Sequence, residues 1–134
     1  MSHETPSMPS VSPVLFYEDL GAAAAWLCTH AGFVERMEDR ITDEHGVVQH
    51  AELLLGDGLV ILSRSYEAFA APGAGRAPTA TTYVLAADVD AHHDATVAGG
   101  ATVTTALRDT DYGARVYAIV DPFGQHWIFA QARA

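Results

Sequence analysis

The chain has 134 residues, of which 49% are apolar and 18% charged, and its net charge is −10. These values are typical of one globular domain with a core of its own, and no apolar run approaches the ~20 residues of a membrane-spanning helix. Because a strongly negative chain repels phosphate backbones and anionic lipids, nucleic-acid and membrane partners are disfavoured, whereas neutral or cationic small molecules are not.

Residues 1–10 are rich in Ser and Pro and lack the basic segment followed by an apolar run that marks a secretory signal. We expect a disordered leader and a cytoplasmic protein. The single cysteine, Cys28, cannot form an internal disulfide, which is compatible with a reducing compartment.

The first half of the chain predicts one helix among four strands. Residues 11–17 form a short apolar run, after which Asp19 can cap a helix with apolar residues at helical spacing, and Gly32 ends that helix. Three further strands are expected at residues 33–41, 47–55 and 59–63.

The second half repeats this order after a linker at residues 65–78, which is rich in Ala, Gly and Pro. Its expected elements are a strand at 79–87, a helix capped by Asp88 and ending at Gly99-Gly100, and strands at 102–107, 114–120 and 125–131. A shift of 67 positions superimposes Gly46 on Gly113 and Ile61 on Ile128. We predict an α+β domain over residues 11–131, built from two βαβββ modules at 11–64 and 79–131.

Helices that cover one face of such a sheet leave the other face open as a ligand cup. Strand alternation, with Ala and Leu assigned to the helix side, predicts His50 and Glu52 in the cup. The 67-residue shift aligns His50 with Tyr117 and so predicts Tyr117 in the cup. Arg115, two residues earlier on the same strand, is expected to point to the same side. On the last strand the same reasoning predicts His126, Ile128 and Ala130 in the cup, with Trp127 and Phe129 against the helices.

The pattern His50-x-Glu52 leaves three interpretations open: a metal site, an acid/base pair, or a polar pair on a solvated face or subunit contact. His92 and His93 diverge on a helix, so we expect them on its surface. The chain contains no nucleophile elbow, phosphate loop, dinucleotide fingerprint or His-Glu-x-x-His motif. Aromatic residues expected to flank the cup, where flat apolar ligands would stack, are Phe16, Tyr66, Phe69, Tyr112 and Tyr117.

The two modules, the helix start at residues 89–92, the helix end at 98–101 and the turn Asp121-Pro122-Phe123-Gly124 before Trp127 together resemble the vicinal-oxygen-chelate superfamily. This superfamily includes glyoxalase I, extradiol dioxygenases and bleomycin-resistance proteins. The resemblance covers residues 12–131. It implies an eight-stranded, U-shaped mixed sheet with helices on its convex face, and a homodimer whose cups include residues from both chains.

Enzymes of the superfamily usually bind a divalent metal on the first and last strands of each module. The matching positions here are Ser12, Ile61, Thr82 and Ile128, none of which is a good ligand. The resemblance therefore favours the metal-free branch, whose members sequester antibiotics without a cofactor.

We therefore expect a metal-independent protein that binds an antibiotic or another bulky, partly aromatic natural product. The alternative is a lyase, isomerase or dioxygenase with a divalent metal such as Zn, Ni, Mn or Fe at a displaced site formed by His50, Glu52 and His126. A third possibility is that the cup is filled by the linker. The predicted ligand-binding residues are Phe16, His50, Glu52, Tyr66, Phe69, Thr82, Tyr112, Arg115, Tyr117 and His126.

Overall fold

The computed structural model describes residues 8–64, 69, 71–72 and 78–133. Within these residues the first module contains β1 (Val14–Phe16), α1 (Leu20–His30), β2 (Val34–Glu35), the 3-10 helix η1 (Met37–Asp39), β3 (Ile41–Thr42), β4 (Val48–Leu55) and β5 (Gly58–Ser63). The second module contains β6 (Thr82–Leu85), α2 (Val89–Ala98), β7 (Thr102–Asp109), β8 (Ala114–Val120) and β9 (His126–Ala132).

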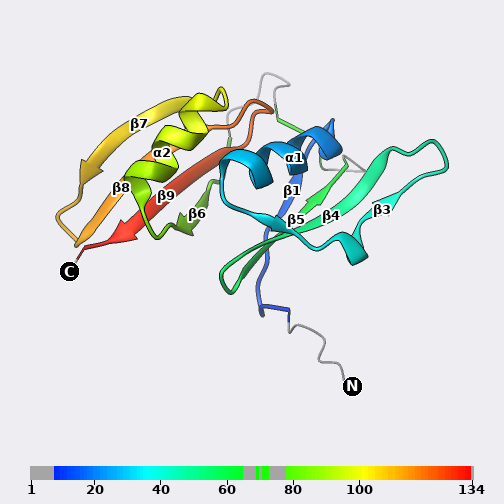
Figure 1. Cartoon of the computed structure of the whole chain (residues 1–134), viewed down its shortest axis with the longest axis horizontal. Helices are drawn as coiled ribbons and strands as arrows, with labels where there is room; N and C mark the ends of the chain where they lie inside the picture. The colour runs from blue at the N-terminus through cyan, green and yellow to red at the C-terminus, as the bar shows by residue number, and fades with distance from the viewer. Residues whose placement is uncertain (1–7, 65–68, 70, 73–77, 134) are drawn as a thin grey trace.

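Each module forms its own mixed sheet, and the two modules lie side by side along the long axis of the molecule (Figure 1). The strand order is β1-β5-β4-β2 in the first sheet, with β3 also paired to β4, and β6-β9-β8-β7 in the second. In both sheets the first strand of the module runs parallel to its last strand. The predicted α+β fold with two βαβββ modules is confirmed, although the strands form two hydrogen-bonded sheets instead of one.

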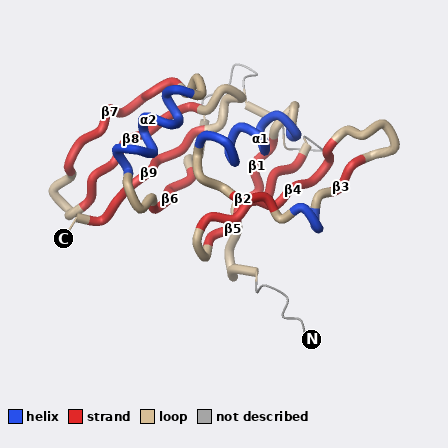
Figure 2. The backbone as a smooth tube through the Cα atoms, in the orientation of Figure 1, coloured by secondary structure: helices blue, strands red, loops and turns tan. Residues whose placement is uncertain are grey.

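The single strand expected at residues 33–41 is instead divided into β2, η1 and β3 (Figure 2). Charged side chains pair at the break, where the Nε of Arg36 donates to Asp39 at 2.8 Å across one tight turn. Arg40 then reaches back to Glu35 with two hydrogen bonds of 2.7 Å. The backbone N–H groups of Asp39 and Arg40 donate to carbonyls of the same turn at 3.0 and 3.1 Å, so the ladder of an uninterrupted strand does not form here.

The two helices begin as predicted and end against one another. Asp19 and Asp88 cap α1 and α2, each accepting a hydrogen bond of 3.1 Å from a backbone N–H in the first turn. At the other ends, Trp26 of α1 donates to the carbonyl of Gly99 at 2.7 Å, and His92 of α2 bonds the carbonyl of Ala31 at 2.8 Å. Each helix thus satisfies a free carbonyl at the C-terminus of its partner. No helix in the described ranges is long and apolar enough to cross a membrane.

One continuous core joins the helix-covered faces of both sheets. The rings of Phe33 and Trp127, which come from different modules, lie 5.6 Å apart. The largest fully buried side chains of this core are Trp127, Tyr17, Tyr117, Phe129, Leu20, Leu27, Leu53, Leu62 and Ile119. Because the apolar surface of both modules is shared in this core, neither module buries its helix side alone.

Asp121, which is 3% exposed, fixes the contact between the modules. Its Oδ2 accepts hydrogen bonds from the hydroxyl of Tyr17 at 2.6 Å and from the indole of Trp127 at 3.0 Å. Its Oδ1 accepts from the backbone N–H groups of Phe123 and Gln125 at 2.9 and 3.0 Å. Burial, followed by the negative charge of Asp121, raises the pKa of Tyr17 well above its ordinary value. The Asp-Pro-Phe-Gly turn therefore has a structural role in connecting β1 to β9.

Replacing Asp121 with Ala should lower the free energy of unfolding by about 3 to 5 kcal/mol, because the buried donors of Tyr17 and Trp127 lose their acceptor. Urea denaturation monitored by circular dichroism measures the change. Asp111→Ala, at an exposed aspartate in the β7–β8 turn, is the matched control and should stay within about 0.5 kcal/mol of the wild type. Equal losses in the two variants would contradict the role of Asp121.

His92 links the modules through both nitrogens of its ring and is not a helix-surface residue as expected. Its Nδ1 lies 2.6 Å from the hydroxyl of Tyr117, which lies 2.9 Å from the hydroxyl of Thr96. Burial lowers the pKa of His92 and outweighs the hydrogen bond to Ala31, which raises it. Burial also raises the pKa of Tyr117 to about 12. Both groups are therefore neutral in the folded protein near pH 7.

The lowered pKa of His92 predicts a loss of stability in mild acid. Below the ordinary histidine pKa of 6.5 the unfolded chain binds a proton that folded His92 does not, so the free energy of unfolding falls as the pH falls. The contribution of His92 to the free energy of unfolding is complete above pH 6.5. Between pH 6.5 and 5.5 it falls by at most about 1.4 kcal/mol. Urea titrations at pH 7.5 and 5.5 should show that His92→Gln loses less unfolding free energy between the two pH values than the wild type does. His45→Gln, at an exposed histidine, should keep the wild-type dependence; an unchanged pH dependence in His92→Gln would contradict this account.

Candidate functional site

The open face of the first sheet carries a row of side chains that we call the open row: Phe16, Ser63, His50 and Ile41. Phe16 lies opposite Ser63, Ser63 opposite His50, and His50 opposite Ile41 on successive strands. Residues opposite one another project to the same side of a sheet. Ala51 and Leu53 of β4 are buried in the core, so His50 must point to the other, open side.

Glu52 forms a polar pair with His50 on this face. The Nε2 of His50 lies 3.0 Å from Oε2 of Glu52. The guanidinium of Arg36 lies 3.4 Å from the other carboxylate oxygen, Oε1, which is buried and accepts no hydrogen bond from a described residue. The backbone N–H of Arg36 donates to the carbonyl of Glu52 at 2.8 Å. The side chains of Glu52 and Arg36 are 12% and 11% exposed, whereas that of His50 is 30% exposed. His50 is therefore the accessible member of a restrained charged group.

Phe16 and Phe69 form an aromatic wall at one end of the open row. Their rings lie 5.1 Å apart and are nearly parallel, with an angle of 14° between their planes. Phe16 is half-buried, and Phe69, from the predicted linker, is 56% exposed. The wall thus presents an exposed aromatic ring beside the open row, as the sequence predicted for these two residues.

The open face of the second sheet is more apolar. Tyr83 and Leu85 of β6 are 51% and 65% exposed, and Tyr83 lies beside Ile128 of β9. Burial, with a smaller contribution from the neighbouring Tyr112, raises the pKa of Tyr83. On the same side of β8 and β9, Ala114, Val116 and Ala130 form a small apolar cluster that is itself buried. We refer to Tyr83, Leu85 and Ile128 as the second open face.

Two of the predicted cup residues, Tyr117 and Arg115, lie on the helix-covered side instead. Tyr117 is fully buried beneath α2, and Arg115 forms hydrogen bonds of 3.0 to 3.2 Å with Asp90 of that helix. The cause is the hairpin register. Leu62 and Phe129 are 67 residues apart. Ala51, which pairs with Leu62, and Tyr117, which pairs with Phe129, are only 66 residues apart. A shift by one residue moves a strand's side chains to the opposite face, so the prediction for β8 is wrong.

The remaining predicted residues have mixed positions. Trp127 and Phe129 face the helices as expected, so the alternate residue His126 is on the open side of β9. Thr82 lies opposite Trp127 and so shares the helix-covered side, and its neighbour Tyr83 occupies the open position. Tyr112 is 68% exposed in the β7–β8 turn. Tyr66 lies outside the described residues, as does most of the predicted linker.

The donor atoms on the open faces do not fit the divalent metal of the superfamily's enzymes. The first and last strands of each module place Val14 beside Ile61 and Tyr83 beside Ile128, which offer three hydrocarbon side chains and one phenol. Among the described residues, no three His, Cys, Asp or Glu side chains are gathered in one place. His50 and Glu52 are adjacent, but His126 belongs to the other sheet.

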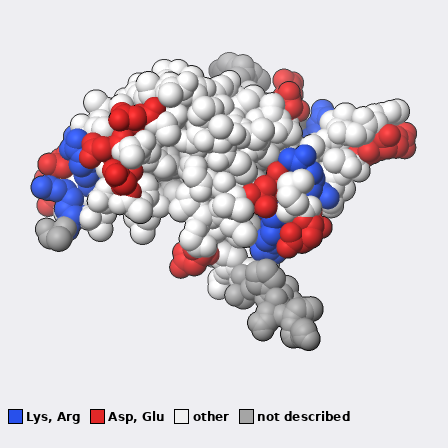
Figure 3. All heavy atoms as spheres, in the orientation of Figure 1, with Lys and Arg blue, Asp and Glu red and all other residues white. Residues whose placement is uncertain are grey.

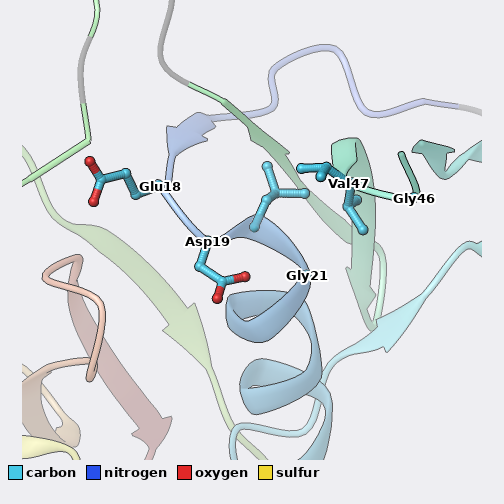
Figure 4. A pocket seen from close by; sticks show the side chains of 7 residues that line it. Glu18, Asp19, Gly21, Gly46 and Val47 are labelled. Carbon is cyan, nitrogen blue, oxygen red and sulfur yellow. The ribbon is translucent and has the colours of Figure 1, made fainter. Parts of the chain in front are cut away.

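Two cavities lie away from the open row. One of about 460 Å³ is at the start of α1 and is lined by Glu18, Asp19, Gly46 and Val47 among others. Its Asp19 is occupied in capping α1, and Glu18 points away from Val47 (Figure 4). The second, of about 370 Å³, lies between the β4–β5 turn and β6, and Tyr83 and Leu85 are part of its wall. Neither cavity contains a constellation of reactive groups.

Charged side chains gather toward the two ends of the molecule, and the middle of the face shown in Figure 3 has few of them. At one end Arg115 connects Asp90 and Asp109, and Arg133 also reaches Asp109. These are exposed ion pairs, which contribute little to stability. They are separate from the group of Arg36, His50 and Glu52.

The geometry defines a class of protein with two βαβββ modules, helices on one side of each sheet, and an open side that carries aromatic and polar residues. The family model of the Glyoxalase/Bleomycin resistance protein/Dioxygenase superfamily matches residues 10–129. The chain therefore belongs to this superfamily.

Similar proteins agree with this assignment. An uncharacterised protein of Mycobacterium tuberculosis is 31% identical over 129 residues, which cover 92% of this chain and 74% of the relative. The crystal structure of TioX from Micromonospora sp. ML1 has a TM-score of 0.69 and 28% identity, covering 94% of this chain and 98% of that one. A family enzyme from Burkholderia phytofirmans shares the fold, with a TM-score of 0.69, 16% identity, and coverage of 89% and 94%.

Proposed function

We propose that this protein binds a bulky, partly aromatic small molecule, such as an antibiotic, on the open face of the first sheet and sequesters it without a metal. The observation that carries the proposal is the open row, in which the aromatic wall and the His50–Glu52 pair share one accessible surface. Flat rings stack on aromatic side chains, and a few polar groups then fix their orientation. The presence of bleomycin resistance proteins in the family supports this function.

The residues present favour binding over the metal-dependent lyase, isomerase or dioxygenase chemistry of other family members. Those reactions require several N or O ligands around a cation. The paired positions on the first and last strands of the modules supply three hydrocarbon side chains, Val14, Ile61 and Ile128, and the phenol of Tyr83. The net charge of −10 favours neutral or cationic guests.

We further propose that a second copy of the chain completes the cup. The second open face leaves Tyr83 and Leu85 more than half exposed, and apolar surfaces of this kind mark association sites in soluble proteins. A twofold dimer would place this face over the open row of the partner, and each guest would then be enclosed by two chains. Enclosure matters because affinity depends on the apolar area removed from water.

Sedimentation equilibrium tests the dimer. The wild type should sediment as a dimer at micromolar concentration, and Leu85→Glu should shift it to a monomer because a carboxylate would be buried in the interface. Val97→Glu, at a residue of α2 that is 42% exposed, is the matched control and should remain dimeric. A monomeric wild type would contradict the shared cup.

Phe16→Ala tests the aromatic site itself. The probe is proflavine, a planar cationic acridine, followed by fluorescence anisotropy. Because a stacked aromatic pair contributes about 0.5 to 1.5 kcal/mol beyond its buried area, loss of the Phe16 ring should weaken binding by up to about tenfold.

Val97→Ala, on the helix side, is the control for Phe16→Ala and should bind proflavine like the wild type. Circular dichroism confirms that both variants are folded. A folded Phe16→Ala protein with wild-type affinity, or a wild type that shows no saturable binding, would contradict the proposed site.

A further inference from the structure

The hydrogen bond between His50 and Glu52 determines which edge of the imidazole faces the open row. A carboxylate only accepts hydrogen bonds, so the ring nitrogen next to it, Nε2, carries the hydrogen. In the neutral ring Nδ1 is then a hydrogen-bond acceptor, and it lies on the ring edge opposite Nε2. No hydrogen bond from Nδ1 to another described residue is present.

An ion pair with Arg36 keeps the carboxylate of Glu52 beside the imidazole of His50. Arg36 contacts the carboxylate at 3.4 Å and is itself bonded to Asp39 at 2.8 Å. The hydrogen bond to Asp39 raises the pKa of Arg36 further, so its positive charge is permanent. The chain Asp39–Arg36–Glu52–His50 is thus a positioning device that ends at an imidazole acceptor.

The spacing along the open row indicates the size of guest that can use this acceptor. Phe16 and His50 are on strands separated only by β5, which corresponds to ~10 Å across the sheet. Ser63 lies between them and has a small side chain, whose hydroxyl donates to the carbonyl of Arg64 at 3.4 Å. Two fused rings with one polar substituent would extend from the aromatic wall to His50.

We propose that His50 selects aromatic guests that carry an O–H or N–H group at the edge of a fused ring system, by accepting their hydrogen bond at Nδ1. Glu52 is a positioning residue that keeps the hydrogen of the imidazole on Nε2. This inference rests on the proposed function, because it requires that a flat guest occupies the open row. It adds the chemical class of that guest.

A matched pair of neutral probes tests the inference. Equilibrium dialysis at pH 7.5 compares 2-naphthol, which has a hydroxyl donor, with 2-methoxynaphthalene, in which a methyl group replaces the donated hydrogen. The wild type should bind 2-naphthol about tenfold more tightly, as expected for one net hydrogen bond. His50→Leu should reduce this preference below about twofold and leave the affinity for 2-methoxynaphthalene within about twofold of the wild type.

Glu52→Gln tests whether Glu52 orients the imidazole of His50, as distinct from stabilising the protein as a whole. Its amide can donate to the imidazole and no longer fixes the hydrogen on Nε2, so the preference for 2-naphthol should fall while the affinity for 2-methoxynaphthalene stays constant. Glu38→Gln, at an exposed glutamate of η1, is the matched control and should keep the wild-type preference.

The outcomes distinguish this inference from the proposed function. Equal binding of the two probes by the wild type, or a preference that persists in His50→Leu, would overturn the role of His50 and leave the aromatic site in place. Failure of the wild type to bind either probe would overturn both.

Discussion

The hydrogen bonds to the buried carboxylate of Asp121 are the constraint on which the arrangement of the two modules depends. Because Asp121 lies in the β8–β9 turn and Tyr17 lies between β1 and α1, their 2.6 Å hydrogen bond connects segments that are 104 residues apart. The contacts of Trp26 with Gly99 and of His92 with Ala31 reinforce the same junction. With the helix sides joined in one core, the opposite faces of both sheets remain outside it.

This division explains why the polar chemistry is located where it is. The helix-covered side must exclude water, so its polar groups are paired with one another, as in the chain of Thr96, Tyr117 and His92. On the open side no such requirement holds, and His50 can keep one ring nitrogen available. The open row is therefore an accessible surface supported by a rigid core, which is the arrangement that a binding site needs.

Much of the fold could be predicted from the sequence because its signals are local. The caps Asp19 and Asp88, the repeated order of elements and the glycine-containing turns each act over a few residues, and all were found in the structure. Strand alternation also placed His50 and Trp127 correctly. It failed for Tyr117, because the two hairpins differ in register by one residue, and a sequence repeat does not reveal a register.

The parts of the site that sequence reasoning missed depend on pairing between distant segments. Arg36 and Ser63 join His50 and Glu52 only through strand neighbours, and Tyr83 takes the open position expected for Thr82 because of its pairing with Ile128. Alternation within residues 82–85 allows either side to face the core, because Val84 and Leu85 are both apolar and only the structure shows that Val84 is the buried one.

The central claim is that guests bind on the open row and not in the cavities beside α1 or β6. Two-dimensional ¹H–¹⁵N correlation spectra of the labelled protein, recorded during titration with proflavine, test this claim most directly. The account predicts that the largest shift changes occur at the amides of Phe16, His50 and Ser63. Changes concentrated instead at Gly46 and Val47, or at Gly56 and Asp57, would contradict it.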